Sequence, residues 1–275
     1  MKISIITVSF NEEKNIRRTI ESVLNQTSCD FEYIICDGKS TDKTVEIAKE
    51  YENAFLKKGI CYIVNSEKDK GIYDGMNKGI DLATGDYIYF LNAGDWFYSG
   101  DVIEKVVSGA IMHEAPDVIY GDAAGVERGV INYICGDDAK LKEHMSICHQ
   151  ALFASLALAK KKKFDLKYRI AADYNFTLGL KMAGCSFLKL DIMMAYFSSD
   201  GISTTNVDGC FNEQADIKES YGISVDRNAL KKSIKKNKRA QRIKSLIPYR
   251  VWILWSSKIK NKRIVDIKDS NPNNF

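Results

Sequence analysis

One short turn in this chain places a single acid where it could do chemistry. The apolar run Tyr87–Leu91 has the composition of a buried strand and leads directly into the turn Asn92–Asp95. In open α/β sheets, ligands bind at the edge formed by the carboxyl ends of the strands. The small residues beside Asp95 allow backbone to approach a bulky ligand closely, and a carboxylate oxygen suits a hard cation such as Mg²⁺ or Mn²⁺. The turn is therefore a candidate metal site.

Two other polar segments follow strand-like runs in the same way. They are Ser9–Glu12, after the first run, and Asp37–Asp42, after the second. An aromatic side chain at a strand end can stack on a nucleobase, and an acid there can accept a hydrogen bond from a base or a ribose. Taken alone, Asp37-Gly38 is a common turn, and Ser40 or Thr41 is a helix N-cap. Together with Asp95 these segments predict a nucleotide site at one sheet edge.

The elements that must position these residues alternate regularly. Four apolar runs have strand character, at 3–8, 31–36, 60–64 and 87–91. Between them, Ile16, Ile20, Val23 and Leu24 share one helical face, and Val45, Ala48 and Tyr51 share another. Alternating strands and helices predict an α/β fold with a single, mainly parallel, Rossmann-like sheet flanked by helices.

Composition sets the broad class of protein. The 275 residues are 45% hydrophobic and 28% charged, which is ordinary for a folded protein. Seven cysteines occur without any C-x-x-C pair, which is typical of buried thiols in a reducing compartment and disfavours a zinc site. The opening segment 1–8 has the character of a first strand rather than a signal peptide. We therefore expect a cytoplasmic protein.

The alternation weakens beyond Tyr120, although a helix is predicted from about Asp173 to Met182. We expect one domain over 1–225, made of two halves (1–120 and 121–225), followed by an extension over 226–275. From 227 to 263 the extension contains no acid, many Lys and Arg, and an apolar and aromatic island over 246–255. This island is shorter than the roughly 20 residues that span a bilayer.

The basic extension has two interpretations. It could lie on an anionic membrane surface, on the inner face of the plasma membrane, or it could be a terminal helix packed on the domain. Nucleic acid is not an expected partner, because the aromatic residues are bunched rather than spaced along a groove.

Several motifs together resemble a known family. They are Val8–Glu12, Leu24–Thr27, Asp37–Thr44, Asp69–Gly79, Ala83–Asp86 and Leu91–Asp95. In this order over the first 100 or so residues, they are similar to the family 2 glycosyltransferases of GT-A fold. The resemblance implies a nucleotide-sugar donor, most simply a UDP-sugar, a divalent cation (Mn²⁺ or Mg²⁺), and inversion at the anomeric carbon. It makes 1–120 the nucleotide-sugar-binding half of the domain and 121–225 the acceptor-binding half.

The resemblance also assigns roles to residues. Asp95 matches the last acid of the family's metal-binding motif, while Asn92 stands where an acid is common and Gly38 where many members have a second Asp. The positions that match the donor site are Ser9, Phe10, Glu12, Asp37, Ser40, Lys70, Gly71, Tyr73, Asp74, Asn77, Asn92 and Ala93.

The second half of the chain resembles the polysaccharide-assembly members of the family more faintly. Asp173 falls where the family places its catalytic base, although an acid at a helix N-terminus can also serve the helix dipole. The positions that match the acceptor side are His149, Gln150, Gly201 and Ser203. A hydrogen-bonded core histidine remains an alternative for His149.

The predicted activity is transfer of a single sugar to a glycan or lipid-linked saccharide in cell-surface polysaccharide biosynthesis. The chain lacks the Q-x-x-R-W motif and the transmembrane runs of the processive synthases in this family. A dehydrogenase would show G-x-G-x-x-G after its first strand, where this chain has Ser9–Asn11, and the glycine-rich, basic loop of a nucleotidyltransferase is also missing. A non-catalytic sugar-nucleotide or glycan binding protein derived from this fold is the alternative, because Asp95 is the only acid of its turn.

Overall fold

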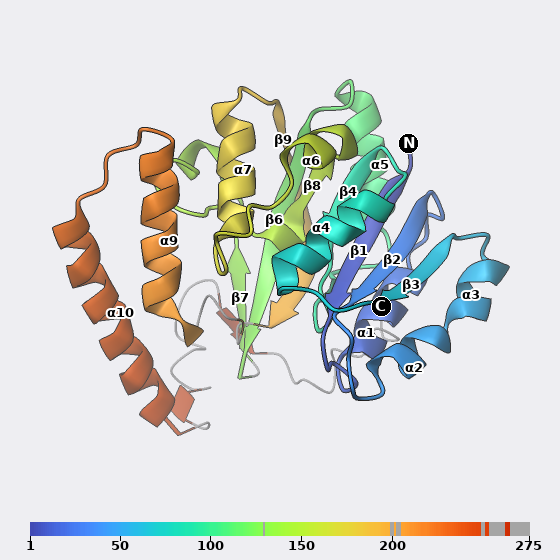
Figure 1. Ribbon diagram of the computed structural model, residues 1–275, viewed down its shortest axis with the longest axis horizontal. Helices are drawn as coiled ribbons and strands as arrows, with labels where there is room; N and C mark the ends of the chain where they lie inside the picture. Colours follow the sequence, from blue (N-terminus) through green and yellow to red (C-terminus); the bar gives the residue numbers. More distant parts are fainter. Residues whose placement is uncertain (129, 199–200, 202–204, 249–250, 253–261, 265–275) are drawn as a thin grey trace.

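The four predicted strands form one parallel array. This computed structural model describes residues 1–128, 130–198, 201, 205–248, 251–252 and 262–264. The strands are β1 (Ile3–Ser9), β2 (Phe31–Asp37), β3 (Tyr62–Ser66) and β4 (Tyr87–Phe90). They are ordered β4-β1-β2-β3 with parallel pairing throughout. Their carboxyl ends therefore meet at one edge, at the bottom of Figure 1.

The second half of the chain extends the same sheet beyond β4. The added strands are β5 (Trp96–Phe97), β6 (Val118–Glu127), β7 (Val130–Ile134), β8 (Leu152–Ser155), β9 (Phe187–Ser198) and β10 (Lys262–Ile264). β8 is antiparallel to β4 and β6, whereas β9 runs parallel to β6 and also pairs with β5. The strand that immediately follows Asp95 is thereby tied to a strand from the far half of the sequence.

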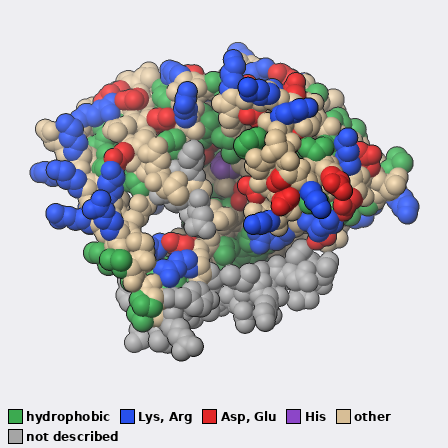
Figure 2. Space-filling model, turned by 60° about the horizontal axis from the view of Figure 1, so that its bottom comes forward, with side chains coloured by type: hydrophobic (Ala, Val, Ile, Leu, Met, Phe, Trp, Pro, Cys, Tyr) green, Lys and Arg blue, Asp and Glu red, His purple; other side chains and the backbone are tan. Residues whose placement is uncertain are grey.

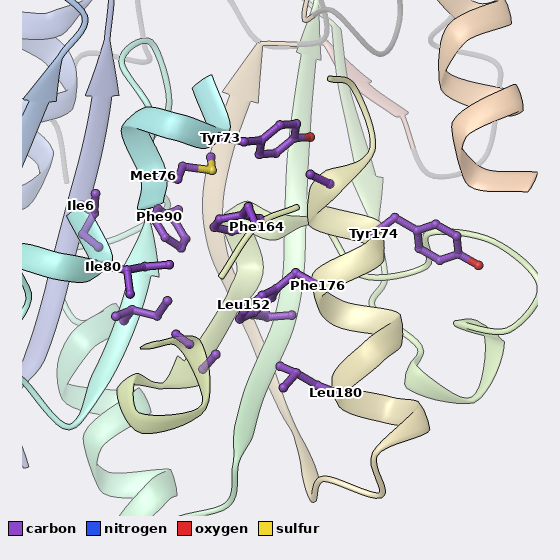
Figure 3. Packing of buried hydrophobic residues seen from close by; sticks show 14 of the residues in the cluster. Ile6, Tyr73, Met76, Ile80, Phe90, Leu152, Phe164, Tyr174, Phe176 and Leu180 are labelled. Carbon is purple, nitrogen blue, oxygen red and sulfur yellow. The ribbon is translucent and has the colours of Figure 1, made fainter. Parts of the chain in front are cut away.

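Helices cover both faces of the sheet (Figure 1). They are α1 (Ile16–Leu24), α2 (Thr44–Lys49), α3 (Glu52–Lys57), α4 (Ile72–Leu82), α5 (Val102–Met112), α6 (Leu156–Lys162), α7 (Ala172–Met182), α9 (Val207–Ser220) and α10 (Arg227–Leu246), with short 3₁₀ turns η1 (Asp138–Lys140) and η2 (His149–Ala151). Neighbouring strand residues face opposite sides: Ile5 packs in the cluster under α1 and α5, and Ile6 in the cluster under α4 and α7. Figure 3 shows the second cluster, with Phe90 and Phe164 between α4 and α7.

The predicted helical faces are confirmed with one change. Ile16, Ile20 and Val23 are buried on α1, and the helix predicted near Asp173–Met182 is α7. Tyr51, however, lies between α2 and α3 rather than on one continuous helix. Its hydroxyl group accepts a hydrogen bond from Arg17 (3.0 Å) and donates one to Glu21 (2.8 Å), both on α1.

The basic part of the extension is helix α10, which packs on α9 at the left of Figure 1. The side chain of Asp226 caps its start by accepting from the backbone N–H groups of Asn228 and Ala229. Arg227 pairs with Asp216 and Glu219 of α9, at 2.5 and 2.6 Å. Lys and Arg side chains gather along the edge of the molecule where α10 lies (Figure 2). Within the described residues, no helix combines the length and apolarity that crossing a bilayer requires.

Candidate active site

The turn at Asn92–Asp95 sits directly on the carboxyl edge of the sheet. The backbone N–H of Ala93 donates to the carbonyl of Val8 (3.1 Å), which continues the β1–β4 pairing past the end of β4. The N–H of Asp95 then donates to the carbonyl of Asn92 (2.9 Å) and closes the turn. Gly94 has φ +99°, a backbone conformation that favours glycine. The sequence therefore folds locally so that Asp95 lies beside β1.

Helix α1 holds this turn in place through side-chain hydrogen bonds. The hydroxyl of Thr19 donates to the carbonyl of Asp95 (2.7 Å) and accepts from the N–H of Gly94 (3.0 Å). The guanidinium of Arg18 donates to the carbonyl of Gly94 (3.0 Å) and stacks 3.6 Å from the centre of the Trp96 ring. Sequence reasoning missed both residues, because a helical pattern does not show which loop its polar positions will meet.

The carboxylate of Asp95 is buried, with 7% of the residue exposed. Burial raises the pKa of Asp95 to about 6, although the nearby His149 and a hydrogen bond from Gln150 partly oppose the shift. Gln150 Nε2 lies 3.2 Å from Asp95 Oδ2. The predicted acceptor residue Gln150 is thus placed against the predicted metal ligand.

The same turn offers a second oxygen for a cation. Asn92 Oδ1 is buried and has no hydrogen-bond partner among the described residues, which is costly unless something else satisfies it. A buried carboxylate beside an unsatisfied amide oxygen is a donor set that suits Mg²⁺ or Mn²⁺. Across the described residues, no cluster of three or more His, Cys, Asp and Glu side chains could hold a metal by itself. A cation held by Asp95 and Asn92 Oδ1 would need further oxygen ligands.

A cleft of about 500 Å³ opens beside this turn. Its lining consists of Val8, Ser9, Phe10, Glu12, Gly38, Lys68, Asp69, Gly71, Ile72, Asn92 and Ala93. Six predicted donor residues are among them: Ser9, Phe10, Glu12, Gly71, Asn92 and Ala93. The Phe10 ring is 60% exposed, so one ring face is free to stack on a planar ligand. Lys68 and Asp69 also line the cleft, although neither was predicted as a site residue.

Asp37 lies beside the cleft but is occupied by the protein itself. It is buried, and its carboxylate accepts hydrogen bonds from the hydroxyls of Ser9, Ser40 and Ser66 and from the backbone N–H of Ser40. Asp37 therefore ties together the loops that follow β1, β2 and β3. A Cβ at Gly38 would approach within 2.7 Å of Asp69 Oδ2, so a side chain at this position would require the Asp69 carboxylate to shift.

Four other predicted donor residues contact neighbouring segments of the protein. The backbone N–H of Lys70 donates to Asp74 (2.9 Å), which fixes the entry into α4. Asn77 exchanges two hydrogen bonds with the backbone of Phe164, at 2.9 and 2.8 Å. Tyr73 is buried on α4, and its hydroxyl lies 2.7 Å from the carbonyl oxygen of Ile170. Tyr73 and Asn77 thus hold the segment that leads to α7.

Asp173, the predicted base, stands in the first turn of α7 with 19% of its side chain exposed. Its Oδ1 lies 3.1 Å from the Tyr73 hydroxyl and 2.8 Å from the backbone nitrogen of Tyr174. Burial and the Asp173 carboxylate raise the pKa of Tyr73 well above its usual range, so this phenol remains a donor. Figure 3 shows Tyr73 of α4 pointing toward α7.

Glu213 of α9 supports the loop before Asp173. Its carboxylate accepts from the backbone N–H groups of Arg169, Ile170 and Ala171, each at 2.9 Å. Nothing in the sequence singles out Glu213, because it lies far along the chain from this loop.

His149 links the two halves of the site. Its Nδ1 lies 3.3 Å from Asp173 Oδ2, and its Nε2 lies 3.1 Å from Asn92 Nδ2. Gly201, a predicted acceptor residue, is exposed. Ser203, the other one, lies outside the described residues.

Comparison with known proteins defines the class of this protein. The profile described as glycosyl transferase family 2 matches residues 4–139, and a relative 32% identical over 254 residues covers 90% of this chain. The chain therefore belongs to glycosyl transferase family 2, as its motifs predicted.

The particular relatives come from several organisms. The relative just described is the PGL/p-HBAD biosynthesis glycosyltransferase of Mycobacterium bovis BCG, of which 96% is covered. Among solved structures, Staphylococcus aureus TarS 1–349 in complex with UDP-GlcNAc matches with a TM-score of 0.62 and 18% identity, over 84% of this chain and 69% of that one. A larger TarS chain is matched over 41% of its length.

A second solved structure supports the same fold. The mannosyltransferase of Pyrobaculum calidifontis in complex with GDP-Man and Mn²⁺ matches with a TM-score of 0.59 and 12% identity, over 93% of this chain and 79% of that one. These matches confirm the predicted GT-A fold of this chain.

Proposed function

We propose that this chain moves one sugar from a nucleoside-diphosphate sugar to a hydroxyl of a glycan or lipid-linked saccharide, with inversion, in cell-surface polysaccharide biosynthesis. A UDP-sugar is the donor that we favour, because TarS, which shares the fold, is described with UDP and with UDP-GlcNAc. The cleft beside the Asn92–Asp95 turn is large enough for a nucleotide, and the exposed Phe10 ring offers a surface for the base. Asp37, Tyr73 and Asn77 would shape this site by holding its loops.

One observation carries the proposal. The partly exposed carboxylate of Asp173 and the Asn92–Asp95 turn contact the same side chain, His149, although they come from opposite halves of the sequence. A base that takes the proton of an acceptor hydroxyl must stand close to the donor's anomeric carbon. The described contacts therefore suit a direct displacement in which Asp173 receives that proton.

The Asn92–Asp95 turn would hold the cation through Asp95 and Asn92 Oδ1. A bound Mg²⁺ or Mn²⁺ supplies positive charge for the departing diphosphate. The phenol of Tyr73 and the backbone of Tyr174 hold Asp173 Oδ1, which fixes the carboxylate for proton transfer.

A panel of nucleotide sugars with Mn²⁺ tests the activity, with slow donor hydrolysis and transfer to a glycan library as the two measurements. We expect one donor to be consumed, and Asp173→Asn to lower its turnover by about 10²- to 10⁴-fold, the usual contribution of a general base. The matched control is Asp165→Asn, which changes a partly exposed acid in the loop before α7. Wild-type turnover in a folded Asp173→Asn variant would remove Asp173 from the mechanism.

A non-catalytic sugar-nucleotide or glycan binding protein is the second candidate, because Asp95 is the only acid of its turn. Binding of UDP by calorimetry, together with no hydrolysis and no transfer across the whole panel, would favour this candidate over the enzyme.

We also propose that α10 associates with the anionic inner face of the plasma membrane. Among its exposed basic side chains, Lys238 pairs with Asp208, whereas six others form no ion pair with a described acid: Lys231, Lys232, Lys235, Lys236, Arg239 and Arg242. Ile243 and Leu246, at the end of the helix, are 64% and 81% exposed. Basic and apolar side chains on one exposed helix suit shallow binding to anionic head groups.

Vesicle sedimentation tests the membrane proposal. The double variant Lys232→Glu/Lys236→Glu should bind phosphatidylglycerol vesicles less than wild type, whereas Lys43→Glu/Lys49→Glu, which changes exposed lysines near α2, should bind as wild type does. Equal binding by both variants would contradict a role for α10.

A further inference from the structure

The two oxygens of Asp173 have different surroundings. A carboxylate oxygen has about two lone-pair sites. Oδ1 already accepts from the N–H of Tyr174 and lies 3.1 Å from the hydroxyl of Tyr73, whose single proton it shares with the carbonyl oxygen of Ile170. Among the described residues, Oδ2 faces only the ring of His149, at 3.3 Å from Nδ1. One lone pair of Oδ2 is therefore left for a proton from outside.

Asn92 determines which nitrogen of His149 carries a proton. Its Nδ2 lies 3.1 Å from Nε2, and an amide nitrogen can only donate. In this orientation of the Asn92 amide Nε2 accepts, and a neutral imidazole that accepts at Nε2 carries its proton on Nδ1. That proton faces Asp173 Oδ2. The Nδ1–Oδ2 distance is long for a hydrogen bond, as is common for catalytic contacts before substrate binds.

We propose that Oδ2 is the proton-accepting atom of Asp173, and that Asn92 and His149 are positioning residues that orient it by fixing the Nδ1–H tautomer. The inference rests on the proposed function and names the atoms of its proton transfer. The O–H bond of the acceptor breaks and its proton passes to the free lone pair of Oδ2. The acceptor oxygen bonds to the anomeric carbon, and the bond from that carbon to the diphosphate breaks, with its electron pair leaving on the diphosphate.

The same geometry explains why Asn92 replaces the acid that is common at its position. An Asp at 92 would present only acceptor oxygens to Nε2 and would draw a proton to that nitrogen. A neutral ring would then have no N–H to donate to Asp173. The amide of Asn92 therefore connects the Asn92–Asp95 turn to Asp173 through the ring of His149.

Nuclear magnetic resonance of ¹⁵N-histidine-labelled full-length protein tests the tautomer directly, without substrate. The chain has only three histidines, so His149→Asn identifies the signals of His149 by their loss. At pH 8 with a chelator, we expect Nδ1 protonated and Nε2 unprotonated, and Asn92→Asp should protonate Nε2. A wild-type ring protonated at Nε2, alone or with Nδ1, would overturn the inference.

Two substitutions of His149 separate its contacts. Asn can replace the Nδ1 donor that faces Asp173, whereas Gln reaches the position of Nε2 and keeps only the contact with Asn92. For the donor that the wild type consumes, we expect His149→Gln to lower kcat by about 10²-fold, as misplacement of a reacting group does, and His149→Asn by about tenfold or less. The donor KM should stay within about twofold in both, because His149 is not part of the cleft lining.

The opposite pattern has a clear meaning. Raised acceptor KM with unchanged kcat in both variants would make His149 an acceptor contact instead. A double-mutant cycle adds a control: Asn92→Asp should lower kcat in wild type but not further in His149→Asn, whereas an effect through the cation would appear in both backgrounds. A wild-type ring protonated at Nε2 removes this inference alone, whereas no donor consumption by the wild type across the panel removes the proposed function.

Discussion

Two buried carboxylates at opposite ends of the parallel strands, Glu32 and Asp95, have opposite surroundings. Glu32, at the start of β2, accepts hydrogen bonds from Lys2 (2.5 Å), Ser4 (2.7 Å) and both the N–H and hydroxyl of Thr84 (2.6 Å each). Burial alone would raise the pKa of Glu32, but these donors lower it to about 2. Asp95, at the carboxyl edge, has few donors, and burial raises its pKa to about 6.

The difference shows how one sheet divides structural and functional tasks. A fully satisfied charge stabilises the fold, whereas a buried charge short of partners destabilises it until a ligand supplies the missing interaction. Asn92 Oδ1 resembles the Asp95 carboxylate in this respect, because it is buried without a hydrogen-bond partner among the described residues. Asp37, which is buried at the same carboxyl edge and accepts four hydrogen bonds, resembles Glu32, so Asp95 and Asn92 differ from the other buried polar groups described here.

The largest expected effect compares Asp95→Asn with Glu32→Gln in turnover. Asp95→Asn should lower turnover by at least about 10³-fold, because a metal contributes several kcal/mol to stabilising the transition state. Glu32→Gln should leave turnover per folded molecule near wild type, since Glu32 lies at the other end of β2. Kinetics at matched folded concentrations measure both, and equal losses would mean that the two ends are not functionally distinct.

Glu32→Gln should instead act on stability. The shift in the pKa of Glu32 from 4.5 to about 2 corresponds to about 3 kcal/mol, present above pH 4.5 and lost as pH falls toward 2. Urea denaturation at pH 7 should show a loss of that order in Glu32→Gln. The difference from wild type should shrink below pH 4, and a difference independent of pH would contradict the electrostatic origin.

The contribution of Asp95 to the free energy of unfolding should depend on pH with the opposite sign to that of Glu32. Because its pKa is raised in the folded state, the folded protein binds the extra proton, and the free energy of unfolding should fall as pH rises from about 4 to 6. With chelator present, Asp95→Asn should be more stable than wild type at pH 8 by up to about 3 kcal/mol. The two proteins should be equal near pH 4. If Asp95→Asn were less stable than wild type at pH 8, burial of the Asp95 charge would not be the destabilising feature that distinguishes it from Glu32.

Gly94→Ala should have the smallest effect on stability, about 1–2 kcal/mol, because alanine is strained at φ +99°. Gly222→Ala is the matched control, since its φ is +74° with no neighbour within 4 Å of an added Cβ. Thermal denaturation should show similar losses in both, but only Gly94→Ala should also lower turnover, through the displaced Asp95. Equal turnover would show that the turn tolerates this shift.

Local sequence patterns predicted the first half of the fold because each apolar run there corresponds to one strand of the sheet. The strands end where the apolar runs Ile3–Val8 and Tyr87–Leu91 end, so parallel pairing brought Ser9 and Asp95 to one edge as expected. Tyr51 lies between α2 and α3 with its hydroxyl bound by α1, and such a contact has no sequence pattern.

The remainder of the site depends on pairings between distant segments. The contact of His149 with Asn92 and Asp173 requires β8 to lie beside β4 and α7 to face α4. Glu213 reaches the loop before Asp173 from α9. Motif resemblance located Asp173 and His149 as residues, but only tertiary packing determines that they touch.

Helix α9 contacts both the loop that precedes Asp173 and the basic helix α10. Through Glu213 it fixes the loop that presents Asp173, and through Asp208, Asp216 and Glu219 it holds the basic helix α10. Any partner whose affinity for α10 depends on the position of α9 is therefore thermodynamically coupled to the orientation of Asp173. Such coupling is reciprocal: an acceptor that settles against Asp173 would change the affinity of α10 for its partner by the same factor. Binding of a partner to α10 and the orientation of Asp173 would then be linked in one equilibrium.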